Sequence, residues 1–203
     1  MLLFPGSIAL LIPLAFIGGL FTFAIVAMLT FQNGMKPIHV ILAGISISAI
    51  WGGVQAILLT AYSDRLIGVM NWLNGTLGNL TWSDIRILFF LAAPVIFIVL
   101  LLAAKLNLII LGDDVMYNLG VPIVFYRFLF SFIAVYFAAI SVAFTGVIGF
   151  VGLIVPHIGR LLVGNNHIRL LPVTLLLGAN LLLGADTLAR VIIAPQEIPV
   201  GDR

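Results

Sequence analysis

One long charge-free stretch, residues 128–156, limits what the chain can fold into. Its 29 residues would extend about 44 Å as one α-helix, at about 1.5 Å per residue. A bilayer's hydrocarbon core is only about 30 Å thick, so one upright crossing cannot hold the whole stretch. Gly146, Gly149 and Gly152 follow one another at three-residue spacing in its second half. We therefore predict a break at these glycines, with a spanning helix to about Thr145 and a separate, shorter helix over residues 153–163.

The rest of the sequence has the same apolar character. Of the 203 residues, 63% are hydrophobic and only 8% are charged, which excludes a soluble globular domain. We predict an all-α, polytopic membrane protein with about five spans and short kinked, interfacial and coupling helices. With no fixed-period repeat and no low-complexity linker, residues 1–203 are expected to form a single transmembrane domain. The predicted spans are residues 7–30, 40–62, 87–104, 128–145 and 170–190.

Residues 64–86 are too polar to cross a membrane. Apolar residues recur there at three- and four-residue spacing, and Trp72 and Trp82 are of the type enriched at membrane interfaces. We predict a short amphipathic helix on the membrane surface, a turn over residues 75–79, and Thr81 or Ser83 as the cap of the next helix.

Residues 112–120 also change character. Acidic residues in a first turn and glycine after the last turn are typical of a short helix outside the bilayer. Gly112, Asp113 and Asp114 start this segment, Val115, Met116 and Leu119 form its apolar side, and Gly120 with Pro122 ends it.

The Lys and Arg residues of the short loops indicate which side of the membrane each loop lies on. One set of loops carries five Lys or Arg and the other set carries four, which favours the first set as cytoplasmic. The cytoplasmic set is Lys36, Lys105, Arg127, Arg160 and Arg169; the external set is Arg65, Arg86, Arg190 and Arg203.

Few residues could carry chemistry. Without cysteine there is neither a disulfide nor a thiolate metal site, and without a P-loop there is no nucleotide cradle. The net charge of +2 comes from scattered cations, which argues against nucleic acid as a partner. His157 and His167 lack metal-site spacing, so we expect no metal or cofactor, and we interpret Pro156 and His157 as structural residues of a helix kink. Asp186 and Arg190 stand four apart, and either pair with each other or leave Arg190 to meet a partner.

Several motifs resemble those of the iron-siderophore and cobalamin ABC importer permeases, the FecCD family. The most specific motif is the run over residues 146–160 with Asp186 and Arg190 downstream and a Glu-x-Pro-x-Gly over residues 197–201. Weaker upstream similarities are Leu42-Ala43-Gly44-Ile45, Trp72 with Gly75, Leu111-Gly112-Asp113 and Leu119-Gly120.

The resemblance implies a permease subunit that pairs with a second permease subunit, in a homo- or heterodimer, around a substrate path. It also implies ATP-binding cassette ATPase subunits, an extracytoplasmic substrate-binding protein, and a place in the cytoplasmic membrane. Ten helices are typical of the family, so this chain would be a partial permease domain lacking the first three helices and the last one.

Two sets of site residues follow from the resemblance. Gly112, Asp113, Asp114, Met116, Leu119 and Gly120 match the family's cytoplasmic coupling helix, which rests on the ATPase. Arg190 matches an external arginine that pairs with an acidic residue of the binding protein. Asp114 and Met116 depart from the usual family residues, and the family's early arginines are absent from this sequence.

Two other hypotheses stay open from the sequence. An ion- or proton-coupled secondary transporter would use Asp186 and the broken helix near residues 146–152. An intramembrane hydrolase built on His157 has weaker support. Within the importer hypothesis, the sequence does not distinguish a ferric siderophore from haem or cobalamin.

Overall fold

The computed structural model describes residues 8–193 apart from residues 33, 63–74, 76 and 79. The described residues form helices joined by short turns and contain no strand, which confirms the all-α prediction. The helices are α1 (Ile8–Phe31), α2 (Pro37–Ala61), α4 (Trp82–Leu101), α5 (Ala103–Ile110), α6 (Asp113–Asn118), α7 (Ile123–Thr145), α8 (Val151–Val163) and α9 (His167–Ile193).

Five of these helices are long and apolar enough to cross a membrane: α1, α2, α4, α7 and α9. Their mean hydropathy lies between 1.8 and 2.4. They correspond to the predicted spans, and the chain is a multi-pass membrane protein. The predicted surface helix falls on residues 63–74, outside the described residues.

Four spans begin earlier than predicted, α2 and α9 by three residues and α4 and α7 by five. α4 starts at Trp82 rather than residue 87, because Thr81 and Asp84 form a capping box, and this confirms Thr81 as the predicted cap. The Thr81 backbone N–H donates to the Asp84 carboxylate at 2.9 Å, and the Asp84 N–H donates to the Thr81 hydroxyl at 3.4 Å. α7 starts at Ile123, so Arg127 lies inside the helix instead of before it.

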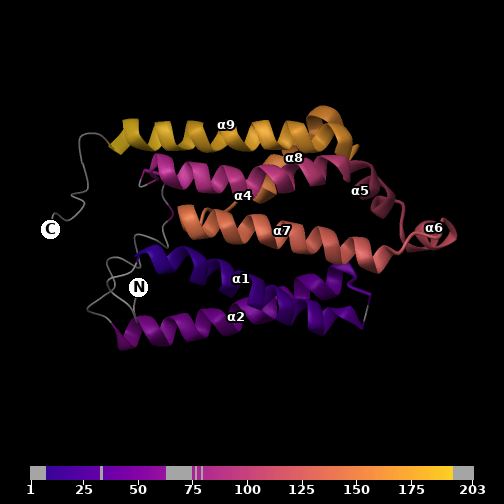
Figure 1. The fold of residues 1–203 in the computed structure, drawn as a ribbon, viewed down its shortest axis with the longest axis horizontal. Helices are drawn as coiled ribbons and strands as arrows, with labels where there is room; N and C mark the ends of the chain where they lie inside the picture. The colour runs from indigo at the N-terminus through magenta and orange to yellow at the C-terminus, as the bar shows by residue number, and fades with distance from the viewer. Residues whose placement is uncertain (1–7, 33, 63–74, 76, 79, 194–203) are drawn as a thin grey trace. The chain divides into compact units, whose positions relative to one another are not determined.

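The chain divides into two compact units, residues 1–148 and 149–203. The single domain expected over residues 1–203 stays a prediction. In the first unit, α1 packs against both α7 and α2, and Figure 1 shows it between them. Phe23, Ala27 and Met35 form a buried cluster against which Val40 and Val135 pack. α4 contacts α7, where the Tyr136 hydroxyl donates to the Leu91 carbonyl at 3.1 Å.

In the second unit, α8 packs against α9. Val155 and Gly159 are the buried residues of α8, and Leu170 of α9 is only 3% exposed. Gly159 lies close to Thr174 and Leu170, so the two helix backbones approach each other at this point.

The long charge-free stretch is interrupted between α7 and α8. α7 ends at Thr145, and Gly146 follows it with φ 73°. Gly149 lies before α8, and Phe150 precedes the first residue of α8 with φ 65°. Gly152, Pro156 and His157 lie within α8. The interruption is thus shorter than the glycine series, because the last of the three glycines is helical.

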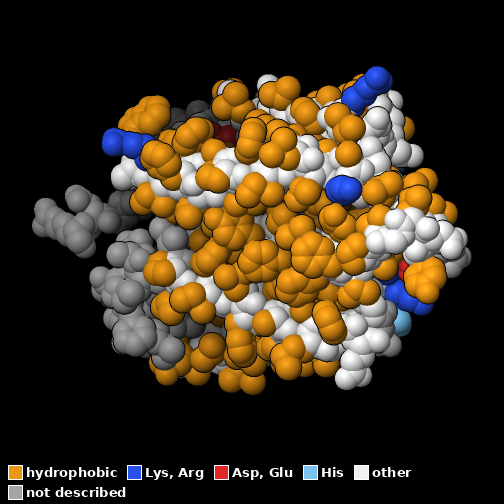
Figure 2. Space-filling model, turned by 45° about the vertical axis from the view of Figure 1, so that its right-hand side comes forward, with side chains coloured by type: hydrophobic (Ala, Val, Ile, Leu, Met, Phe, Trp, Pro, Cys, Tyr) orange, Lys and Arg blue, Asp and Glu red, His pale blue; other side chains and the backbone are white. Residues whose placement is uncertain are grey.

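Large apolar side chains remain exposed along the spans. In Figure 2, hydrophobic side chains cover most of the visible face and little charge interrupts them. Burial of polar groups in lipid is costly, so such a surface suits contact with acyl chains or with other apolar helices.

Candidate coupling surface around helix α6

The candidate site is centred on α6, a helix of six residues between α5 and α7. Figure 1 shows α6 projecting beyond the ends of these two helices. A helix of this length is not stable in isolation, so its ends and its packing must hold it.

Glycines at both ends of α6 allow the chain to turn sharply. Gly112 precedes the helix with φ 92°, and Gly120 follows it with φ 68°. The Gly120 N–H donates to the Tyr117 carbonyl at 3.0 Å, and the Val121 N–H donates to the Met116 carbonyl at 3.1 Å. This pair of hydrogen bonds is a Schellman motif, which satisfies carbonyls that the end of a helix otherwise leaves free.

The apolar side chains of α6 point in two directions. Met116 is fully buried, whereas Val115 is 42% exposed and Leu119 is 58% exposed. The sequence placed all three on one apolar side, but the structure separates Met116 from the other two. Met116 therefore supports α6 from within the first unit, and the exposed apolar surface of α6 consists of Val115, Tyr117 and Leu119.

Tyr117 was not predicted as a site residue, although it is 84% exposed. Its position between Met116 and the Asn118 end of the helix carried no charge or glycine signal in the sequence. Its residue type alone could have marked Tyr117 as a candidate, because tyrosine is enriched where protein surfaces bind one another.

Arg127 of α7 connects α6 to the turn between α1 and α2. Its Nη2 donates to the Asp113 Oδ1 at 2.6 Å, and its Nη1 donates to the Asp113 Oδ2 at 3.3 Å. The same Nη1 donates to the Gly34 carbonyl at 3.2 Å. The Arg127 side chain is 13% exposed and that of Asp113 is 45% exposed. The sequence identified Asp113 as a site residue but not its partner, which lies fourteen positions later.

The described residues of the α1–α2 turn form backbone hydrogen bonds of their own. The Gly34 N–H donates to the Phe31 carbonyl at 3.0 Å, and the Met35 N–H donates to the Thr30 carbonyl at 3.1 Å. These bonds repeat the Schellman pattern that ends α6, with Gly34 at φ 65°. Met35, only 2% exposed, places its side chain in the buried cluster with Phe23 and Ala27.

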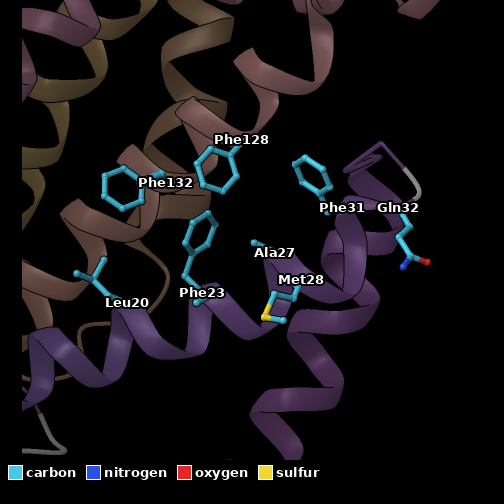
Figure 3. A pocket seen from close by; sticks show the side chains of 9 residues that line it. Leu20, Phe23, Ala27, Met28, Phe31, Gln32, Phe128 and Phe132 are labelled. Atoms are coloured by element: carbon cyan, nitrogen blue, oxygen red, sulfur yellow. The ribbon is translucent and has the colours of Figure 1, made fainter.

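An apolar groove lies beside this turn, between α1 and α7. Figure 3 shows its labelled side chains, among them Phe23 and Phe31 of α1 and Phe128 and Phe132 of α7. Gln32 is the polar member of its lining. The sequence did not predict this groove, because it depends on which faces of α1 and α7 meet.

The other predicted site residues lie elsewhere. His157 is exposed on α8, and Asp186 is half-buried on α9. Arg190 lies on α9 one helical turn after Asp186, and Asp114 lies in α6; the side chains of Arg190 and Asp114 are outside the described residues. Among the residues that the structure describes, no three His, Cys, Asp or Glu side chains come together as a metal site.

A family model described as the FecCD transport family matches residues 1–201, nearly the whole chain. The chain belongs to the FecCD transport family. This confirms the resemblance on which the expectations for α6 and Arg190 rest, while the roles of those residues stay predictions.

Curated relatives in the FecCD family include two iron-related permeases. The hemin transport system permease protein HmuU of Yersinia pestis is 38% identical over 188 residues, which are 92% of this chain and 56% of the relative. The Fe(3+) dicitrate transport system permease protein FecD of Escherichia coli is 36% identical over an alignment of 206 positions that covers 99% of this chain and 63% of the relative. The chain thus spans little more than half the length of the curated relatives it matches.

A solved structure has the same fold as this FecCD chain. It is an inward-facing conformation of an ABC transporter assigned to the metal-chelate type. The TM-score is 0.81 at 31% identity, over 93% of this chain and 65% of the other.

Proposed function

We propose that this chain is the membrane-spanning permease part of an ATP-driven importer for ferric siderophores or a related iron chelate. In this proposal it forms the substrate path with a second permease subunit in the cytoplasmic membrane. ATP-binding cassette ATPase subunits bind its inner side, and an extracytoplasmic binding protein delivers substrate to its outer side. The chain itself supplies no nucleotide site.

Membership of the FecCD transport family over residues 1–201 is the observation that carries the proposal. The relatives' names extend it to iron chelates, since HmuU is named for hemin and FecD for ferric dicitrate. Neither name distinguishes one chelate from another for this chain.

The geometry of α6 supports the expected contact with an ATPase. Val115, Tyr117 and Leu119 are exposed on a helix that stands beyond the ends of α5 and α7. An apolar and aromatic cluster at the end of a membrane domain suits insertion into a groove of a soluble partner. Lys36 lies just before α2 and Lys105 lies in α5, and both belong to the set of cations that the charge bias assigns to the cytoplasm.

Arg190 is proposed as the contact for the binding protein. It lies three residues before the end of α9, whereas Arg169 lies at the start of the same helix. Arg190→Glu in the full-length protein is expected to weaken docking by about 1–3 kcal/mol if an acidic partner is partly desolvated. Arg169→Glu is the matched control, because it reverses a charge at the opposite end of α9. Equal docking of both variants and the wild type would remove Arg190 from the proposal.

The experiment for the whole proposal is substrate uptake by the full-length protein with its ATPase and binding protein in liposomes. Radiolabelled ferric siderophore, hemin and cobalamin are compared with and without ATP, and with and without a proton gradient. ATP-dependent uptake of an iron chelate is the expected result. Uptake that continues without ATP but stops when the proton gradient is removed would favour the secondary transporter and contradict the ATP-driven importer.

A further inference from the structure

Arg127 joins α6 to a segment that is distant from it in the sequence. α6 is connected to α5 and α7 by the chain itself and packs against both. Arg127 adds a contact to Gly34, ninety-three positions earlier, at the turn between α1 and α2. We propose that Arg127 is a positioning residue that fixes α6 to the α1–α2 turn, so that a force on α6 moves α1 together with α7. This inference rests on the proposed function of α6 as the ATPase contact.

The geometry of the contact requires an arginine. Both terminal nitrogens of Arg127 donate to the Asp113 carboxylate, and one of them also reaches the Gly34 carbonyl. A guanidinium presents several donors in one rigid plane, whereas a lysine presents a single point charge on a flexible stem. Lysine could keep the ion pair with Asp113 but not the planar fork that spans both acceptors.

Because the Arg127 side chain is largely buried, it depends on its hydrogen-bond acceptors. The Arg127 side chain is only 13% exposed, and its Nε is buried without a hydrogen-bond partner. A cation removed from water is stabilised mainly by the groups it contacts, so Arg127 depends on Asp113 and Gly34 to stay in place. Loss of either acceptor would leave the guanidinium undersatisfied and free to leave this position.

The Gly34 end of the contact lies in a turn with backbone hydrogen bonds of its own. A Cβ on Gly34 would lie 3.9 Å from Val124 Cγ2, so the turn lies close to the first turn of α7. The turn is also fixed by its two backbone hydrogen bonds to Phe31 and Thr30. Arg127 therefore binds a carbonyl that the turn holds at a defined place.

The turn leads directly into the packing of α1 on α7. Met35 follows Gly34 and is buried with Phe23. The Phe23 ring lies 5.7 Å from that of Phe128 and 6.0 Å from that of Phe132, between ring centroids. A displacement at Gly34 thus reaches side chains that join the two spans. Contiguous packing of this kind is a physical route by which motion can pass from one element to another.

The test uses distances within the protein and does not depend on transport. Residues 1–203 contain no cysteine, so spin labels at Tyr117→Cys on α6 and Lys36→Cys beside the turn meet no other thiol in this part of the protein, and any cysteine elsewhere in the full-length protein is replaced by serine. Both positions are exposed. The full-length protein in lipid nanodiscs is measured by pulsed electron resonance. A narrow distance distribution is expected with Arg127, and a broad one with Arg127→Met.

Two further variants make the result decisive. Lys105→Met is the matched control, because it removes an exposed cation from α5 and is expected to leave the distribution narrow. Asp113→Asn removes only the α6 side of the contact, so it broadens the distribution even if Arg127→Met does not fold. Narrow distributions in both Arg127→Met and Asp113→Asn, or in Asp113→Asn alone where Arg127→Met does not fold, would overturn the proposal.

The functional arm measures substrate imported per ATP hydrolysed, without spin labels, in the complete transporter. Arg127→Met and Asp113→Asn are expected to lower this ratio about five-fold or more, while ATP hydrolysis continues and Lys105→Met keeps the wild-type ratio. An unchanged ratio in both variants contradicts the positioning role. If the wild type imports nothing with ATP, the proposed function fails, and the distance measurement still decides whether Arg127 fixes α6.

Discussion

Gly19 of α1 lies directly against Ala139 of α7. A Cβ built on Gly19 would be 3.0 Å from the Ala139 Cβ, closer than most real contacts between such atoms. A Cβ built on the adjacent Gly18 would meet no neighbouring heavy atom within 4 Å. The two glycines therefore differ in role: Gly19 permits the close approach of two spans, and Gly18 does not take part in it. Small residues at helix interfaces serve this purpose where lipid removes the hydrophobic drive for association.

Gly19→Leu is expected to destabilise the protein, because a large side chain at this position must push α1 away from α7. Overpacking of a close contact typically costs about 1–3 kcal/mol. The free energy of unfolding is measured in bicelles. Gly18→Leu is the control, since it makes the same chemical change on the same turn of α1 and meets open space. Equal stabilities of the two variants would contradict the packing assigned to Gly19.

Gly159 offers the corresponding test in the second unit. A Cβ there would lie 2.7 Å from Thr174 Cγ2 and 3.0 Å from Leu170 Cδ1. Threonine is stiff about its first side-chain torsion and Leu170 is buried, so neither neighbour can move away freely. Gly159→Val is expected to weaken the α8–α9 contact by about 1–3 kcal/mol. Gly152→Val, on the same helix with nothing within 4 Å, should lack this packing penalty. Resistance to proteolysis within α8 reports the difference.

The spans were predictable because lipid imposes a simple length rule on apolar stretches. The same rule predicted that residues 128–156 could not form one helix, and α7 does end at Thr145. The boundaries were less accurate where local hydrogen bonds set them. Thr81 and Asp84 start α4 before the apolar stretch begins. Hydropathy alone does not detect this start, whereas the residue types at positions 81 and 83 predicted a cap there.

The candidate site was predictable only in part. Glycines and acidic residues located α6, since those residue types mark the ends of a short helix. The direction of its side chains was not predictable, because six residues make too few turns for an apolar face to be recognised. The contact of Arg127 with Gly34 depends on how α1 meets α7, which no local pattern of the sequence encodes.

Gly75 tests a contact between a loop and the segment that follows α7. It has φ 63°, and a Cβ on it would lie 2.6 Å from the Val147 carbonyl oxygen, a backbone atom that cannot turn aside. Gly75→Ala therefore combines backbone strain with a steric clash. Gly164→Ala is the control for strain alone, because Gly164 has φ 77° and nothing within 4 Å. Strain at such a position costs about 1–2 kcal/mol, and Gly75→Ala is expected to lose more. Thermal unfolding of the two variants in detergent gives the comparison, and an equal loss would remove the Val147 contact from the account.

Tyr117 is the most exposed side chain of the α6 surface formed by Val115, Tyr117 and Leu119. If α6 inserts into an ATPase, truncation of this aromatic residue removes a large contact area at the interface. Tyr117→Ala is expected to weaken binding of the ATPase subunits about tenfold, which corresponds to about 1.4 kcal/mol. The dissociation constant is measured with the full-length protein in nanodiscs. Tyr62→Ala is the matched control, because Tyr62 is also exposed but caps the end of α2 away from the α1–α2 turn. Binding that falls equally in both variants, or in neither, would show that α6 does not dock through this surface.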